Sequence, residues 1–477
     1  MATSLPTVEG QRVELSEELL AELRARLRGE ALIPSDPGYG QARIPFNAMQ
    51  TDRPSLVVRP TGTADVVEAV TFARDNGIEL TVRGGGHSVA GFSSSDGGMV
   101  IDLSLMDGVD VDPEAKIARV QGGALWGDVD RETQLFGLAT PGGVVSDTGV
   151  AGLTLGGGYG WLRRKHGLSC DNVIEAQVVC SDGQVRTASA DMNPDLFWAI
   201  RGGGGNFGIV TSFTFRLHPV GPIVAFTGVF YRQADAADIL RGYREYFRDA
   251  PDEVSPEAIS ITMPADPHLP ETIHDQECFI VAAVHSGDVE QGMEIMQPLR
   301  GLATPLADIS QPMPFAAVQS AFDAFYPRGV FQSYWKSVYL PELSDEAVQL
   351  ITDKGAERPS PLTFVDTFAN GGEMSRVAAG DTAFGDRSAP YMVSIVGCWD
   401  DPADNADNIA WVRQTWEEIG KFGTGAMYLN FNALVDEDAD AGVADTFGPN
   451  LQRLAEIKST YDSGNFFRRN NNVLPAS

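Results

Sequence analysis

The sequence predicts an α+β protein with two domains of different composition. Residues 81–215 hold 26 of the 51 glycines, although they make up little more than a quarter of the 477 residues. A helix and a strand lead directly into the first glycine cluster. Near residue 220 glycine becomes rarer, while Phe, Tyr and Trp become commoner. We therefore expect a glycine-rich domain before this point and, after it, an α+β domain built on an antiparallel sheet.

The glycine-rich region begins with a helix, a strand and a loop. Residues 65–76 carry apolar side chains spaced for one helix face, and Gly77 follows as a stop signal. Residues 78–82 form an apolar strand that runs straight into the RGGGHS loop at Arg83–Ser88. Glycine permits close approach of the backbone to a ligand, and consecutive N–H groups can surround an anion. A flexible linker is the alternative, but linkers lack the strand patterns between these clusters.

Further elements are expected on both sides of the boundary. A hairpin with Asp182-Gly183 at its turn joins two runs rich in β-branched residues. The second region mixes strand and helix patterns, which is typical of an α+β domain. The expected strands are residues 99–103, 117–121, 173–180, 184–188, 208–217 and 279–284, and the expected helix of the second region is 409–419.

The composition excludes several kinds of partner. With 65 acidic and 35 basic residues the formal charge is −30, and no run of Lys or Arg offsets it, so we expect no nucleic-acid partner. The longest apolar run, residues 278–284, is far shorter than the ~20 residues of a membrane span. No secretory signal is visible, so a cytoplasmic protein is expected. The acidic surface suits high salt, although a codon bias explains it equally well.

The cysteines and histidines predict no metal site. The four cysteines are too few and too widely spaced for a disulfide framework or paired zinc ligands. The histidines of the second region lack ligand spacing and partner carboxylates. A lone cysteine in such a protein is ordinarily a small buried apolar residue.

Five ordered segments carry a family resemblance. The helix precedes the first glycine loop instead of following it, so this is not a Rossmann fingerprint. The segments are Arg83–Ser88, Thr148–Gly160, His166–Asn172, Asp195–Gly208 and Asn450–Asn472. Together they resemble the berberine bridge enzyme-like FAD-linked oxidases, which belong to the vanillyl-alcohol oxidase and p-cresol methylhydroxylase superfamily.

The resemblance implies a discontinuous domain layout. An FAD-binding domain of the p-cresol methylhydroxylase type, with two subdomains, would comprise residues 1–221 and a returning C-terminal segment, 428–477. A substrate-binding α+β domain on an antiparallel sheet would be inserted as residues 222–427. The change in composition near residue 220 agrees with the first boundary, whereas nothing in the composition reveals the return.

The resemblance also implies which residues hold FAD. In the family, the His of the glycine loop bonds to the flavin 8α-methyl and a Cys bonds to C6, which places two tethers at His87 and Cys170. Imidazole and thiolate are nucleophiles suited to such bonds. A small residue at Val173 accompanies reaction of the reduced flavin with O₂. The expected cofactor-binding set is Arg83, Gly84, Gly85, Gly86, His87, Ser88, Thr148, Gly149, Gly152, Cys170, Val173, Gly208, Ile209, Val210 and Asn470.

The catalytic base is harder to predict. Many family members carry a YxNY motif whose second Tyr assists catalysis, but here Phe431 takes that position. Strand alternation would put Tyr428 on the face opposite Phe431. A base must come within about 3 Å of the substrate proton. We therefore expect the base at Tyr334 or Tyr391, with Asp366 as a weaker candidate and aromatic packing as the alternative role of both tyrosines.

The activity implied by the resemblance is that of an FAD-dependent oxidase. Hydride from a C–H bond beside oxygen or nitrogen of a sugar, alkaloid or polyketide would pass to the flavin, and O₂ would accept the electrons to give H₂O₂. Three alternatives remain open: a dehydrogenase with another acceptor, a non-catalytic flavin-binding protein and a pyridine-nucleotide enzyme.

Overall fold

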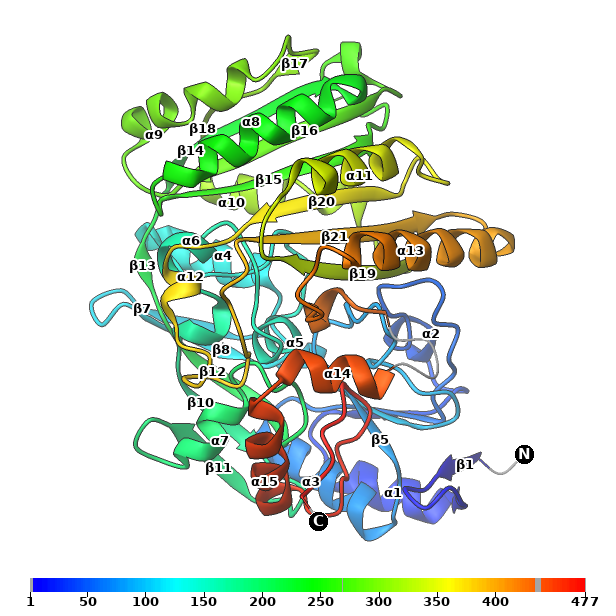
Figure 1. The fold of residues 1–477 in the computed structure, drawn as a ribbon. Helices are drawn as coiled ribbons and strands as arrows, with labels where there is room; N and C mark the ends of the chain where they lie inside the picture. Colours follow the sequence, from blue (N-terminus) through cyan, green and yellow to red (C-terminus); the bar gives the residue numbers. More distant parts are fainter. Residues whose placement is uncertain (1–2, 268, 434–438, 477) are drawn as a thin grey trace.

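Three main sheets organise the molecule, and the computed structural model describes residues 3–267, 269–433 and 439–476. The first and second sheets, from the glycine-rich half, lie in the lower part of Figure 1, and the larger third sheet lies above them. Each sheet contributes to its own buried apolar cluster. The expected α+β class is therefore confirmed.

The first sheet has four strands in the order β3-β4-β6-β5. Its centre is parallel, because β6 (Met99–Asp102) pairs in parallel with β4 (Leu56–Arg59) and β5 (Leu80–Arg83). Parallel neighbours need a crossover, and α3 (Thr63–Asp75) supplies it between β4 and β5 by burying one apolar face. The remaining elements here are β1 (Thr3–Pro6), β2 (Arg12–Leu15), α1 (Glu17–Arg26), β3 (Glu30–Leu32) and α2 (Tyr39–Ala42).

The second sheet has five antiparallel strands in the order β11-β10-β12-β8-β7. Gly183, with φ of 77°, closes the expected hairpin between β10 and β11. Short helices surround the sheet and carry the glycine segments between them. The elements are β7 (Val109–Asp112), β8 (Ile117–Gln121), α4 (Trp126–Thr133), β9 (Leu138–Ala139), α5 (Val150–Leu155), α6 (Arg163–His166), β10 (Val173–Val179), β11 (Val185–Ser189), α7 (Pro194–Ala199), β12 (Ile209–Arg216) and β13 (His218–Pro219).

The third sheet is antiparallel, in the order β17-β14-β16-β15-β20-β21-β19, with β18 also paired to β14. Its long strands are apolar on both faces, which is typical of a sheet covered on both sides. The elements are β14 (Ile223–Arg232), α8 (Ala236–Asp249), β15 (Val254–Thr262), β16 (Glu277–His285), α9 (Val289–Ile295), β17 (Ala307–Asp308), β18 (Gln311–Pro314), α10 (Phe315–Gln319), β19 (Gln332–Leu340), α11 (Asp345–Ala356), β20 (Phe364–Ala369), α12 (Glu373–Arg376), β21 (Tyr391–Trp399) and α13 (Asn405–Gly420).

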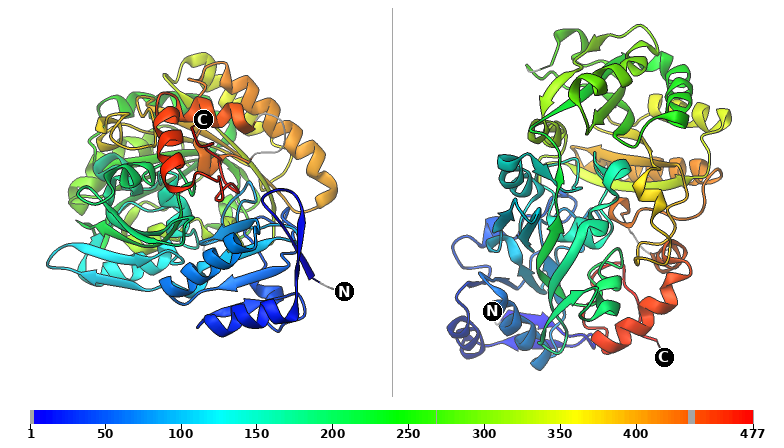
Figure 2. Two further views of the ribbon diagram at one scale, coloured as in Figure 1. Left: turned by 90° about the horizontal axis from the view of Figure 1, so that it is seen from below. Right: turned by 90° about the vertical axis from the view of Figure 1, so that its left-hand side faces the viewer.

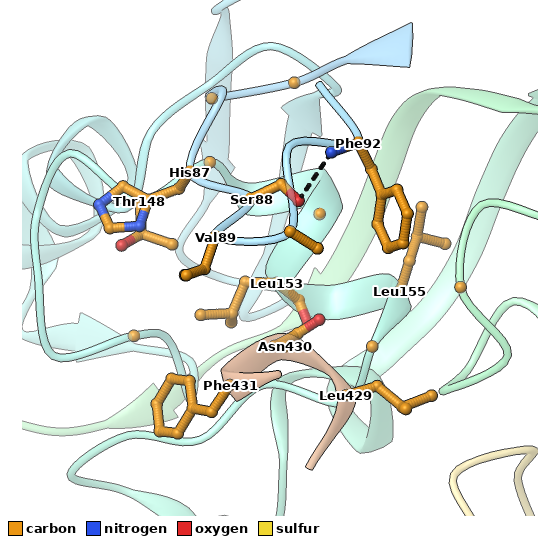
Figure 3. Close-up of a pocket in the computed structure, with 18 of the residues that line it drawn as sticks. His87, Ser88, Val89, Phe92, Thr148, Leu153, Leu155, Leu429, Asn430 and Phe431 are labelled. Atoms are coloured by element: carbon orange, nitrogen blue, oxygen red, sulfur yellow. Dashed lines mark hydrogen bonds between the residues drawn. The ribbon is translucent and has the colours of Figure 1, made fainter. Parts of the chain in front are cut away.

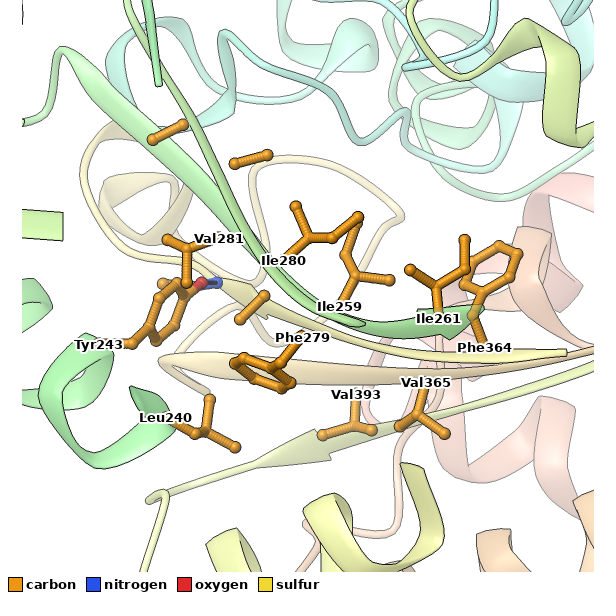
Figure 4. Close-up of a cluster of buried hydrophobic side chains, with 14 of the residues drawn as sticks. Leu240, Tyr243, Ile259, Ile261, Phe279, Ile280, Val281, Phe364, Val365 and Val393 are labelled. Atoms are coloured by element: carbon orange, nitrogen blue, oxygen red, sulfur yellow. Dashed lines mark hydrogen bonds between the residues drawn. The ribbon is translucent and has the colours of Figure 1, made fainter. Parts of the chain in front are cut away.

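The two faces of the third sheet have different neighbours. Helices α8, α11 and α13 cover one face (Figure 1). Figure 4 shows Tyr243 of α8 on that face together with Val365 and Val393, whereas Ile259 and Phe364 lie on the other. Because side chains alternate along a strand, this second face is free of the helices and turns toward the glycine-rich half.

The C-terminal segment returns to the glycine-rich half, at the opposite end of the molecule from α8 (Figures 1 and 2). It contains α14 (Ala439–Phe447) and α15 (Asn450–Tyr461). The buried Lys458 donates three hydrogen bonds, to Asn206 O at 2.7 Å, Phe467 O at 2.9 Å and Asp462 Oδ2 at 2.7 Å. Asp462 also accepts bonds from the backbone N–H groups of the next turn. Every Lys458 donor is therefore satisfied, and its hydrogen bond to Asn206 O joins the segment to the Asn206 loop.

The expected elements agree with the structure except near residue 430. All seven expected strands and both helices are present, with ends shifted by up to four residues. Leu429–Phe431, however, forms a 3₁₀ turn and not a strand, so the alternation assumed for Tyr428 and Phe431 is wrong. Of the helices in the described part of the chain, none has both the length and the apolar character to cross a membrane.

Replacing Lys458 tests the role of the buried ion pair. In Lys458→Met the Asp462 carboxylate loses its partner while buried, which costs about 3–5 kcal/mol. We expect a lower urea midpoint in unfolding followed by tryptophan fluorescence. The exposed Lys421→Met is the matched control and should unfold with the unaltered chain. Coincident curves for all three proteins would contradict this role.

Candidate active site

One large cavity receives side chains from all three sheets. Its volume is about 290 Å³, and its lining combines glycine loops, aliphatic strand residues and aromatic rings. Figure 3 looks into it: His87, Ser88 and Val89 lie along one side, and Leu429, Asn430 and Phe431 along the other. A large concave site with a few polar groups among apolar walls is the arrangement expected for a cofactor and a small substrate.

Most residues expected to bind the cofactor line this cavity. They come from three segments distant in sequence, namely the loop after β5, the segment around α5 and the start of β12. The C-terminal segment adds a fourth contribution. The expected residues found in the lining are Gly84, Gly85, Gly86, His87, Ser88, Thr148, Gly149, Gly152, Gly208, Ile209, Val210 and Asn470.

Two glycine positions leave room for a ligand. A Cβ added to Gly152 or to Gly205 would meet no atom of the described residues within 4 Å, and both glycines line the cavity. Any side chain there would project into the open space. These positions therefore form a cradle that an extended ligand can approach at the level of the backbone.

The His87 ring is held from two directions. Its face stacks on Phe46, with ring centroids 3.9 Å apart and an interplanar angle of 14°. Its Nε2 lies 3.1 Å from Asp147 Oδ1, and only 12% of its side chain is exposed. Arg328 Nη2 lies 3.2 Å from the other Asp147 oxygen. The imidazole is thus fixed at the cavity wall by packing and by a hydrogen bond.

Asp147 also determines which His87 nitrogen is free. Burial raises the pKa of Asp147, but the hydrogen bond and charge of His87, together with Arg328, outweigh burial and lower it. The carboxylate is therefore ionised and can only accept a hydrogen bond, so Nε2 carries the proton. The lone pair that remains for nucleophilic attack is on Nδ1.

Three expected cofactor residues lie outside the lining. Arg83 is buried behind the loop and donates to the carbonyl oxygens of Ser93, Ala42 and Arg43. Val173 belongs to the apolar core of the second sheet. Neither side chain reaches the cavity wall, so the structure gives Arg83 a role in shaping the loop and gives Val173 one in core packing.

Cys170 is likewise separated from the cavity. Its side chain is fully buried in an apolar cluster with Leu168, Phe384 and Tyr428. Burial, followed by the nearby Asp171 carboxylate, raises the pKa of the thiol well above its ordinary value. A thiol is a poor nucleophile, so this surrounding does not favour bond formation to a ligand in the cavity.

The third sheet places two carboxyl groups on the cavity wall. Glu257 of β15 and Asp366 of β20 lie on neighbouring strands, and Phe368 of β20 is directly opposite Glu257. Residues diagonal to one another in a ladder have Cα atoms about 7–8 Å apart, within reach of a long side chain. Glu257 Oε1 and Asp366 Oδ1 are buried and have no hydrogen-bond partner among the described residues.

Burial and mutual repulsion both favour the neutral forms of this pair. Desolvation raises the pKa of Glu257 to about 7, and Arg163, whose Nη1 is 4.0 Å from Oε1, offsets part of that effect. The pKa of Asp366 is raised further above its ordinary value, first by burial and then by Glu257. Two acids with raised pKa values on a cavity wall are typical of a functional site.

The two tyrosines expected as bases do not line the cavity. Tyr334 is buried on the far side of β19, where its hydroxyl accepts a hydrogen bond from Arg413 Nε at 3.1 Å. Tyr391 is buried at the start of β21. The prediction of Tyr334 and Tyr391 as bases is therefore not supported by their positions, whereas the weaker candidate, Asp366, does face the cavity.

The 3₁₀ turn at Leu429–Phe431 brings two aromatic rings to the cavity, that of Tyr428, which precedes the turn, and that of Phe431, its last residue. Tyr428 and Phe431 line it together, with ring centroids 4.9 Å apart. The Tyr428 hydroxyl accepts from Gly158 N at 3.1 Å and from Asn430 Nδ2 at 2.9 Å. Burial raises the pKa of Tyr428 to about 12, so its hydroxyl stays protonated and is no base.

Several further lining atoms are buried and unpaired within the described chain. Buried polar atoms are normally paired, so such a concentration at one cavity indicates that a polar ligand completes their hydrogen bonds. The atoms are Ser93 Oγ, Trp335 Nε1, Ser394 Oγ, both amide atoms of Asn432, Asn470 Oδ1 and Asn471 Oδ1.

The site contains residues that the sequence motifs did not predict. Asp147, Glu257 and Tyr326 belong to none of the five motifs. Glu257 had a local signal, since it is an acid in the middle of the apolar strand β15, as Asp366 is in β20. Asp147 and Tyr326 stand in loops with no such pattern. In the described chain, His, Cys, Asp and Glu side chains form no cluster of three suited to a metal.

Two family models match this chain. Residues 54–189 match an FAD binding domain, and residues 427–474 match a family described as berberine and berberine like. The first match contains the His87 loop and α5, and the second contains the C-terminal segment. Both therefore fall on the elements that build the cavity.

Whole-chain comparisons give the same result. An FAD-linked oxidoreductase of Dictyostelium discoideum is 31% identical over 435 residues, which cover 90% of this chain and 91% of that protein. The (R)-6-hydroxynicotine oxidase of Paenarthrobacter nicotinovorans is 29% identical over 464 residues, covering 94% and 97%. The crystal structure of 6-hydroxy-D-nicotine oxidase from Arthrobacter nicotinovorans superposes with a TM-score of 0.82 at 28% identity, covering 94% of this chain and 98% of that one.

Filling the cradle should exclude the flavin. In Gly152→Leu the new side chain enters open cavity space without a clash, so the chain should fold while its flavin content falls at least about tenfold. Visible absorbance per polypeptide measures this. The control is Gly40→Leu, an exposed helical position that also has free space around it. Equal flavin content in both variants would show that the cavity is not the flavin site.

Proposed function

This chain is an FAD-dependent oxidoreductase of the berberine bridge enzyme-like family, and we propose that it is an oxidase acting on a small organic substrate. The observation that carries the proposal is the single cavity that joins the His87 loop to the carboxyl groups of the third sheet. Reaction requires cofactor and substrate carbon to meet in one shielded volume, and this cavity is lined by both the glycine loops and the third sheet.

We assign the two parts of the cavity to the two ligands. The glycine loops around Gly84–Gly86 and Gly149 would hold the FAD pyrophosphate through backbone N–H groups. The third sheet would hold the substrate. This assignment keeps the proposed division into an FAD-binding domain of residues 1–221 and 428–477 and a substrate domain of residues 222–427. FAD bound there supplies an acceptor for hydride from a C–H bond beside oxygen or nitrogen.

We propose Asp366, supported by Glu257, as the group that takes the substrate proton. Both face the cavity, and an Asp366 oxygen is free to accept. A general base works best when its pKa is near the working pH, and burial raises the pKa of both acids above their ordinary values, that of Glu257 to about 7. The positive charge of Arg163 limits how far burial raises the two pKa values. Arg163 is itself fixed by hydrogen bonds that it donates to Pro256 O and Ala369 O.

We propose one covalent tether to the flavin, at His87, and none at Cys170. His87 lines the cavity with its Nδ1 lone pair available, whereas Cys170 is absent from the lining, and its buried thiol contacts the Asp171 carboxylate and the Arg387 guanidinium within a largely apolar cluster. A protonated thiol is also the weaker nucleophile. The chain therefore departs from the two-tether arrangement that the motif at His166–Asn172 suggested.

O₂ is proposed as the electron acceptor, with H₂O₂ as product. The name of the Paenarthrobacter relative, an oxidase, supports this choice. Val173 no longer does, because it lies in a core and not at the cavity. A dehydrogenase remains the second candidate, since a chain with this fold is described as a glucose dehydrogenase. Stopped-flow reoxidation of the reduced protein separates the two: an oxidase turns over in air, and a dehydrogenase reoxidises slowly.

Acid precipitation tests the tether. The unaltered chain should give a yellow precipitate because its flavin is covalently bound. His87→Ala should give a colourless one and release all its flavin into the supernatant. Cys170→Ala is the matched control, because no tether is proposed at Cys170, and its precipitate should remain yellow. A yellow His87→Ala precipitate would restore the second tether at Cys170, and a colourless unaltered protein would rule out covalent attachment.

The role of Asp147 is tested by the rate of attachment. Without its carboxylate the His87 ring is free to carry its proton on Nδ1, so Asp147→Ala should slow covalent incorporation of FAD into the apoprotein at least about tenfold. Asp147→Asn keeps an acceptor oxygen, so its rate of covalent incorporation should lie between the rates of the unaltered chain and of Asp147→Ala. Mass spectrometry of the intact chain over time gives the rates. Equal rates in all three proteins would show that the hydrogen bond is incidental.

A further inference from the structure

Five aromatic rings surround Asp366 at the substrate end of the cavity. Phe364 and Phe368 flank it on the same face of β20, because side chains two residues apart share a face. From Phe364 the chain of contacts runs to Tyr326 at 5.9 Å between centroids and on to Trp335 at 5.7 Å. It then runs from Trp335 to Phe431 at 5.9 Å and from Phe431 back to Phe368 at 6.2 Å. The rings, here called the aromatic cage, thus form a chain of contacts whose two end members, Phe364 and Phe368, lie on either side of Asp366.

The neighbours of Asp366 across the sheet are uncharged. Ile259 of β15 lies opposite on one side and Ser394 of β21 on the other, and both line the cavity. The guanidinium of Arg163 lies 4.0 Å from Glu257 and 5.2 Å from the Phe368 centroid. Among the described residues Arg163 pairs with Glu257 and no ion pair reaches Asp366, so an ionised Asp366 would have no counterion in its cage.

We propose that the aromatic cage binds a protonated amine, whose positive charge pairs with Asp366 while its alkyl groups contact the rings. Aromatic faces attract cations within about 6 Å of the ring centroid, and the attraction grows when water is excluded. This inference rests on the proposed function, since it names the substrate class of the same site. Asp366 would take the N–H proton of the bound cation and so restore the nitrogen lone pair, after which the C–H bond beside that nitrogen could give a hydride to FAD.

A neutral polyol fits this site less well. It needs many hydrogen-bond partners, whereas the cage offers five apolar faces and few polar atoms, among them Ser394 Oγ and Trp335 Nε1. A polyol also brings no positive charge to stabilise an ionised Asp366, so the carboxyl group would stay protonated in the complex and could not accept the substrate proton. An amine cation supplies the missing charge and the alkyl surface together.

The test compares two ligands of the same shape. Acetylcholine and 3,3-dimethylbutyl acetate differ in that a quaternary nitrogen replaces a carbon, so they isolate the effect of the charge. Isothermal titration of the flavin-loaded protein should show the cation binding at least about tenfold more tightly than the neutral ester. Equal affinities, or no binding of the cation, would overturn the proposal.

Variants locate the preference in the cage. Asp366→Asn should reduce the ratio of the two affinities to within about threefold, and Trp335→Leu should lower the affinity for the cation alone. The control Glu456→Gln removes one exposed carboxylate on α15 and should keep the full ratio, which separates the cage from the overall charge of −30. An unchanged ratio in Asp366→Asn would overturn the assignment.

The measurement also distinguishes failure of this inference from failure of the proposed function. Flavin content is read from visible absorbance before the titration, and the heat of binding needs no turnover. A protein that holds flavin but shows no preference for the cation contradicts the cage alone. A protein that holds no flavin contradicts the proposed function, whatever the titration shows.

Discussion

The contact between two glycines fixes the geometry on which the rest of the site depends. A Cβ on Gly85 would lie 2.4 Å from the backbone N and Cα of Gly149, and one on Gly149 would lie 2.2 Å from Gly85 N. Real side chains do not tolerate such distances, so the loop after β5 and the segment before α5 can meet only as glycine backbones. His87 follows Gly85 by two residues, and Asp147 precedes Gly149 by two. The hydrogen bond between them is therefore a consequence of the backbone contact.

Local sequence patterns predicted the first half of this arrangement well. The helix, strand and glycine loop that end at His87 follow one another in the chain, so spacing alone orders them. Cys170 shows where such reasoning stops. Its position in a motif does not determine which side of the backbone the thiol takes. The Cys170 N–H bonds to Gly157 O, and the side chain turns into the apolar cluster behind the cavity.

The substrate side could be predicted only in part because it depends on strand register. Glu257 and Asp366 are far apart in sequence, and β15 and β20 make them neighbours through pairing that no local pattern encodes. Each had the signal of an acid inside an apolar strand, but the signal does not say which of the two faces is covered by helices. The positions of Tyr334 and Tyr391, which do not line the cavity, depend on the same choice of sheet face. For Tyr428 the error was local, because a 3₁₀ turn replaced the assumed strand.

Burial explains why the two parts of the cavity have opposite electrostatic character. The glycine loops present backbone N–H groups, which favour an anion such as a pyrophosphate. The third sheet presents two carboxyl groups to one nearby arginine, which favours a cation. In a volume shielded from water these preferences act more strongly than they would at a surface. The local arrangement would therefore orient a negatively charged cofactor and the proposed positively charged substrate toward opposite ends of one cavity, which the overall charge of the protein cannot do.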